Sequence, residues 1–91
     1  MRRNIHTLYN YDPPATAEEI HSAALQYVRK VSGMQKPSRA NEAAFERAVA
    51  AIAHATGHFL EELVTSDPPR DREIEADRRR ARAVERFGRV A

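Results

Sequence analysis

The chain has 91 residues, of which 42% are hydrophobic and 31% charged, and its formal net charge is +2. This length supports one domain with a modest core, and the composition is that of a folded protein rather than a disordered one. No stretch approaches the ~20 apolar residues of a membrane span or the apolar run of a signal peptide. Without cysteine there is no disulfide framework or thiolate site. We therefore expect a cytoplasmic protein that does not associate with membranes.

Residues 1–12 form the first predicted segment, an N-terminal arm. Four residues make it too apolar for a free tail: Ile5, Leu8, Tyr9 and Tyr11. We expect it to pack on the rest of the domain as a turn or short helix. Regular structure should stop at Asp12-Pro13-Pro14, because proline lacks a backbone donor and restricts the residue before it.

The next predicted element is a helix over residues 16–32. Thr16 and Glu19 have the spacing of a capping box, in which each side chain bonds the backbone amide of the other residue. Ser32-Gly33 is a suitable end, since glycine adopts the left-handed conformation cheaply. Apolar residues follow at helical spacing and form one stripe: Ile20, Ala23, Ala24, Tyr27, Val28 and Val31.

A longer helix is predicted over residues 38–64, starting at Ser38 or Asn41, which are both favourable N-cap residues. A continuous helix of this length would be ~40 Å long, against a radius of gyration of ~13 Å for a compact domain of this size. The helix therefore spans the whole molecule, breaks near Gly57, or packs against a second copy. We favour the homodimer. Its apolar stripe comprises Phe45, Ala48, Val49, Ile52, Thr56, Phe59, Leu60 and Leu63.

A charged third helix is predicted over residues 71–87, after Asp67-Pro68-Pro69. That tripeptide repeats the one at residues 12–14, either as an internal repeat or as a helix-entry signal used twice, and we favour the second explanation. The apolar residues do not share one stripe, so we expect a loosely docked helix: Ile74, Ala81, Val84 and Phe87. The predicted fold is a single all-α domain of about three helices with an N-terminal arm.

Short motifs along the chain stand in a recognisable order. They include Asn4-Ile5, Pro13-Pro14-Ala15-Thr16, residues 24–33 (Ala-Leu-Gln-Tyr-Val-Arg-Lys-Val-Ser-Gly), Lys36-Pro37-Ser38, Ala44-Phe45 and residues 68–73. Together they resemble a family of small bacterial proteins known as domain of unknown function 2277. The resemblance covers nearly the whole chain and implies no activity or cofactor. Arg2 stands where members are expected to carry cysteine, so no thiol chemistry is implied here.

The junction between the first two helices is the best candidate binding site. Its residues are Arg29, Lys30, Lys36, Ser38, Arg39 and Asn41. Cations beside fresh helix-start amides can hold a phosphate or carboxylate. The alternative is ordinary helix termination: Arg29 and Lys30 complement the end of one helix, and Ser38 or Asn41 caps the next.

His54, His58 and Glu61 share one face of the second long helix, at a spacing that metal ligands use. That face lies opposite the apolar stripe, and residues 55–57 are Ala-Thr-Gly, so the zinc-protease motif with glutamate between histidines is absent. We interpret these residues as surface side chains and predict no metal or other cofactor.

The remaining basic cluster lies in the charged helix: Arg78, Arg79, Arg80, Arg82, Arg86 and Arg89. Acidic residues are mixed with it and one aromatic residue is near, which favours a solvated face or an acidic protein partner over nucleic acid. No nucleophile motif or phosphate loop occurs, so we predict no catalytic residue and lean against an enzyme. Two functions remain: a non-enzymatic interaction module that self-associates through the second long helix, and an anion- or nucleic-acid-binding module that uses the junction cations.

Overall fold

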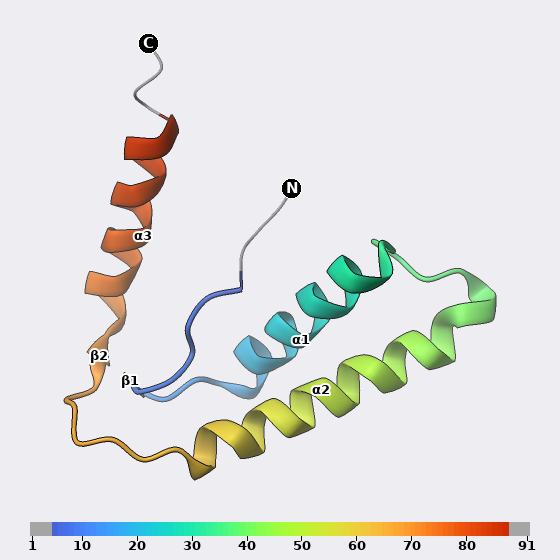
Figure 1. Cartoon of the computed structure of the whole chain (residues 1–91), viewed down its shortest axis with the longest axis horizontal. Coiled ribbons are helices and arrows are strands. Elements are labelled where there is room, and N and C mark those ends of the chain that lie inside the picture. Colours follow the sequence, from blue (N-terminus) through green and yellow to red (C-terminus); the bar gives the residue numbers. More distant parts are fainter. Residues whose placement is uncertain (1–4, 88–91) are drawn as a thin grey trace.

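The computed structural model describes residues 5–87, except for the side chains of 85–87. Within this range the elements are β1 (Tyr11–Asp12), α1 (Ala17–Ser32), the 3-10 helix η1 (Arg39–Asn41), α2 (Glu42–Glu62), β2 (Arg70–Asp71) and α3 (Arg72–Phe87). Figure 1 shows α1 and α2 side by side as an antiparallel hairpin, while α3 stands apart from it. The predicted mostly helical fold is confirmed.

Both ends of α1 follow from its sequence. The Thr16 hydroxyl accepts a hydrogen bond from the Glu19 amide at 3.1 Å, and the Glu19 carboxylate accepts one from the Thr16 amide at 2.8 Å. Gly33 ends the helix with φ 73°, and its amide donates to the Arg29 carbonyl at 2.9 Å. The capping box and the glycine stop are therefore both present, and they satisfy backbone groups that a bare helix end would leave unpaired.

The second long helix differs from its predicted bounds at its start and its end. Residues 39–41 form the 3-10 helix, and α2 begins at Glu42. The side-chain amide of Asn41 donates to the Ser38 hydroxyl at 2.9 Å, and neither side chain accepts a hydrogen bond from a backbone amide at the helix start. These two short polar side chains bond each other locally instead of starting the helix. The helix then continues through Gly57, where no break occurs, and ends at Glu62.

In the described part of the N-terminal arm, residues 5–12, the chain forms no helix or hydrogen-bonded turn, so the predicted turn or short helix is wrong there; the chain bends at Tyr9-Asn10, where Asn10 has φ 65°. The end of the arm, β1, pairs in parallel with β2, with Tyr11 opposite Arg70 and Asp12 opposite Asp71. Two further bonds continue this contact: the Arg70 amide donates to the Asn10 carbonyl at 2.6 Å, and the Asn10 side chain donates to the Pro68 carbonyl at 3.0 Å. The arm finds its backbone partners in a segment almost sixty residues away, which local sequence patterns do not report.

The hydrophobic core lies between α1 and α2 and is small. Among the described residues, Ala24, Val28 and Val49 are buried. Half-buried side chains pack against them: Leu25, Phe45, Ala48, Ile52 and Ala53. Tyr27 and Val31 belong to the predicted apolar stripe of α1, yet they are 47% and 64% exposed. Part of the apolar stripe of α1 is therefore left exposed by the described residues.

The molecule is a thin layer rather than a rounded domain. Its principal extents are 42 × 42 × 16 Å, and the third is little more than the ~10–12 Å diameter of one helix with its side chains. The radius of gyration is 15.9 Å, whereas a compact chain of 91 residues has about 12 Å. One layer of helices cannot enclose a core, because each apolar face needs a second layer against it.

Candidate functional site

An apolar groove runs along one side of the hairpin, where the arm meets α1 and α2. The groove is a hollow of about 340 Å³, and its lining includes Ile5, Ala23, Tyr27, Ile52, Thr56 and Phe59. Ile5 is 48% exposed and Phe59 is 58% exposed, so their apolar surface faces solvent. Large apolar side chains gathered around one hollow are typical of a surface that binds another protein.

Exposed apolar residues continue beyond the groove. Val31 extends it along α1, and Leu63 and Val64 extend it past the end of α2. On α3, Ile74 is 50% exposed and Val84 is 68% exposed. The half-buried residues in the described part of α3 lie on the opposite side of that helix: Arg72, Glu75, Ala76, Arg79 and Ala83. The described residues thus leave apolar side chains exposed on or beside each of α1, α2 and α3.

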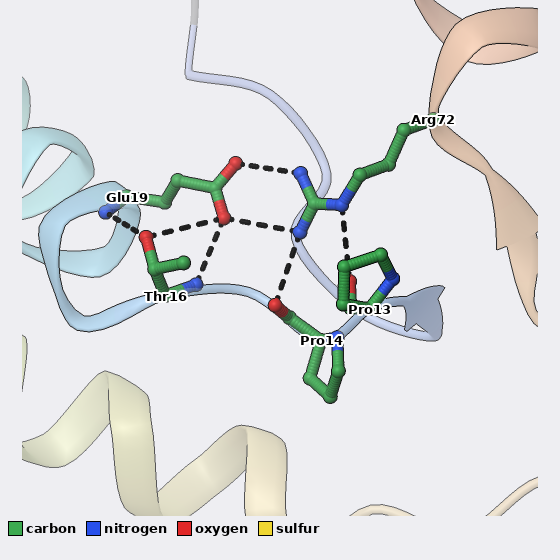
Figure 2. Close-up of polar contacts among 5 residues, drawn as sticks. All are labelled: Pro13, Pro14, Thr16, Glu19 and Arg72. Carbon is green, nitrogen blue, oxygen red and sulfur yellow. Dashed lines mark hydrogen bonds and ion pairs between the residues drawn. The ribbon is translucent and has the colours of Figure 1, made fainter.

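Arg72 joins the start of α3 to the start of α1, and Figure 2 shows this cluster. Its guanidinium donates to both carboxylate oxygens of Glu19, at 2.8 and 3.1 Å. It also donates to the carbonyls of Pro13 and Pro14, at 3.0 and 3.1 Å. The guanidinium lies 5.1 Å from the centre of the Tyr11 ring, within cation–π range. We call Arg72, Glu19, Thr16, Pro13 and Pro14 the Arg72 cluster.

The electrostatics of the Arg72 cluster stabilise the ionised carboxylate. The hydrogen bonds from Arg72, helped by the Thr16 amide, lower the pKa of Glu19 from 4.5 to about 2. In turn, the hydrogen bonds to Glu19 raise the pKa of Arg72. Four of the five guanidinium N–H groups are used, so this arginine is a structural tie rather than a ligand-binding group. The sequence interpretation missed this cluster; the one available signal was that Glu19 already belonged to a capping box.

A second, more polar hollow of about 370 Å³ lies between the arm, α1 and α3. Gln26 lines it, and the side-chain oxygen of Gln26 is buried and has no hydrogen-bond partner among the described residues. Glu19 and Arg72 also line this hollow, but their polar atoms already bond each other. Further polar side chains of the lining come from α1 and α3: Glu18, Ser22 and Arg79.

The predicted anion site at the junction is partly occupied by internal bonds. Arg29 Nε donates to the Gln35 carbonyl at 3.0 Å, and Asn41 bonds Ser38. Lys30, Lys36 and Arg39 are exposed. Three of the six predicted residues therefore help to shape the connection between α1 and α2, while the three remaining cations face solvent.

His54 and His58 are exposed and adjacent on α2, with ring centroids 4.5 Å apart and planes tilted by 58°. Glu61 is exposed one turn further along. Within residues 5–87 no three histidine, cysteine or acidic side chains are placed to share a metal ion. No described helix is long and apolar enough to cross a membrane. Arg2, at the expected cysteine position, lies outside the described residues.

The family comparison covers the hairpin, the Arg72 cluster and the first half of α3. A family model described as "Uncharacterized conserved protein (DUF2277)" matches residues 1–78. The chain belongs to this family. No curated protein and no solved structure matches the sequence. Membership in DUF2277 agrees with the resemblance seen in the sequence, and the family description assigns no function.

Proposed function

We propose that this DUF2277 protein is a non-enzymatic, self-associating module whose complete form is a homodimer in the cytoplasm. The observation that carries the proposal is the exposed area. The chain exposes 7390 Å², whereas a compact monomer of 10.3 kDa exposes about 5,400 Å². The difference is larger than the about 800 Å² that each partner contributes to a standard interface. A second copy laid against the thin layer would supply the missing half of the core.

The composition of α2 supports close packing by a second copy. Alanines 44, 51 and 55 are exposed, and Ala48 is half-buried. With Phe59 they follow one another at intervals of three or four residues, so they share one side of the helix. Small side chains allow two helix backbones to approach closely, and Phe59 would anchor the contact as a large apolar group.

Sedimentation analysis of the purified full chain tests this proposal. We expect a mass twice that of the 10.3 kDa chain. Phe59→Glu places a charge in the exposed apolar face and should convert the dimer to monomer, because the carboxylate would be buried without a partner. Ala50→Glu adds the same charge to an exposed position on the opposite side of α2 and should leave the dimer intact. A wild-type chain that sediments as a monomer at high micromolar concentration would overturn the proposal.

Anion or nucleic-acid binding at the junction is the second candidate. It is supported by the exposed cations Lys30, Lys36 and Arg39, and it is weakened by the internal bonds of Arg29, Ser38 and Asn41. Binding of this kind would weaken steeply as salt rises. Fluorescence anisotropy with a labelled oligonucleotide at low salt decides it: salt-sensitive binding that Lys36→Ala weakens favours this candidate, and no binding at low salt removes its nucleic-acid form.

A further inference from the structure

α3 is the part of the chain with the fewest partners. It is joined to β2 at its base and has no extensive packing with α1 or α2. Figure 1 shows it directed away from the hairpin. A single helix of 16 residues is marginally stable in water, so its order depends on what covers its apolar side.

The Arg72 cluster holds the base of α3, and this bears on where the helix can go. Asp71 accepts a hydrogen bond from the Ile74 amide at 3.0 Å and so caps the first turn. Arg72 bonds the first turn of α1 and the two proline carbonyls at the same point. The start of the helix is therefore held on the hairpin. Its exposed apolar residues, Ile74 and Val84, do not pack against the core of the hairpin.

The hairpin has the complementary feature, an apolar groove that the described residues, 5–87, leave open. Its walls come from Ala23 and Tyr27 on α1 and from Ile52 and Phe59 on α2. A narrow apolar ridge suits such a groove, and within residues 72–84 of α3 the exposed apolar residues are Ile74, Ala81 and Val84. Charged side chains flank this ridge, as expected for a helix that contacts its partner along one seam.

The net charges of α2 and α3 have opposite signs. α2 contains four glutamates (residues 42, 46, 61 and 62) and one arginine, Arg47. Residues 72–84 of α3 contain five arginines and three acidic residues. Pairing α3 with another α3 would bring two arginine-rich helices together, whereas placing it beside α2 brings helices of opposite net charge together.

We propose that, in the dimer, α3 of each copy docks in the groove of the other copy, between its α1 and α2. This inference rests on the proposed self-association and adds to it the element that crosses between the copies. The contact is reciprocal, as a two-fold interface requires, because each copy supplies one α3 and one groove. It also covers both exposed apolar surfaces at once.

The natural absence of cysteine allows a direct test by disulfide cross-linking between copies. Two full-length single-cysteine variants, Val84→Cys and Phe59→Cys, are mixed and allowed to exchange subunits, with a size tag on one of them. Mild oxidation is expected to give the mixed disulfide, which can form only between copies. The matched controls are Ala83→Cys, on the other side of α3, and Ala50→Cys, on the other side of α2. Neither control should cross-link to the facing variant.

The outcomes separate this inference from the proposed function. A wild-type monomer overturns self-association and the docking with it. A wild-type dimer in which the Val84→Cys and Phe59→Cys pair cross-links no better than the controls overturns the docking alone. So does a Val84→Cys variant that cross-links mainly to itself, because that result pairs α3 with α3. As an independent measurement, Val84→Glu should raise the dimer dissociation constant about tenfold or more, with helical content unchanged.

Discussion

The α1–α2 hairpin and α3 are held in place by different kinds of interaction. The hairpin has a small apolar core around Val28 and Val49, and a capping box and a glycine stop define the ends of α1. α3 has no such core and is tied to the start of α1 by the hydrogen bonds of Arg72, in its first turn. Apolar packing supports a helix along its length, whereas a tie at one end fixes where the helix starts and leaves its side free for another contact.

The largest expected effect comes from breaking the core of the hairpin. Val49 is 5% exposed, so Val49→Asp would bury a carboxylate without a partner, at a cost of several kcal/mol. This cost is comparable to the whole stability of a small domain. Far-UV circular dichroism should show loss of most helix at 25 °C. Ala50→Asp, at the exposed neighbouring position, should stay within about 0.5 kcal/mol of wild type in the free energy of unfolding. Native helicity in Val49→Asp would contradict this account of the core.

The next largest effect concerns the tie between the two regions. Arg72→Lys keeps the charge but removes the planar fork that reaches Glu19 and both proline carbonyls together. We expect faster hydrogen exchange in the first turns of α3, while the amides of α1 and α2 keep their protection. Arg82→Lys, at an exposed position of the same helix, is the control and should change neither. Equal loss of protection in the hairpin would mean that α3 and the hairpin unfold together rather than as separate units.

Acid should release α3 before it affects the core. The folded pKa of Glu19 is about 2, below the ordinary value of 4.5, so ionised Glu19 stabilises the fold above pH 4.5. That contribution decreases as the pH falls from about 4.5 towards 2. Protection factors, which correct the exchange rate for its intrinsic pH dependence, should fall in the first turns of α3 as the pH decreases across this range. Glu19→Gln should show the lower protection already at pH 7 and should lack this part of the pH dependence. If the wild type and Glu19→Gln showed the same pH dependence of exchange, the Arg72 cluster would not be what stabilises the start of α3.

The smallest effect acts on the hairpin alone. Gly33 has φ 73°, and a Cβ there would meet no atom within 4 Å, so the cost of Gly33→Ala is conformational rather than steric. We expect the free energy of unfolding to fall by about 1 kcal/mol. Chemical denaturation measures this change, and cross-linking of Val84→Cys to Phe59→Cys in the same background should be unaffected. An unchanged stability would show that another residue conformation ends α1 equally well.

The start and end of α1, the presence of three helices and the family could all be predicted from the sequence. These features depend on residues close together in the chain: Thr16 with Glu19, Gly33 with Arg29, and apolar residues three or four apart. The start of α2 was less predictable, because Ser38 and Asn41 bond each other instead of capping the helix. Both are good cap residues, and sequence spacing does not reveal which partner each one takes.

Tertiary structure decided the features on which the proposed function depends. Glu19 and Arg72 are 53 residues apart in the sequence, and the paired residues of β1 and β2 are still further apart. Neither pairing leaves a periodic signal, since each requires the chain to fold back on itself. The same holds for the exposed groove: Tyr27 and Phe59 belong to apolar stripes that predict burial, yet the thin single layer leaves both half-exposed. Local chemistry determined which segments are helical, whereas the packing of one helix against another determined which apolar faces remain open for a second copy.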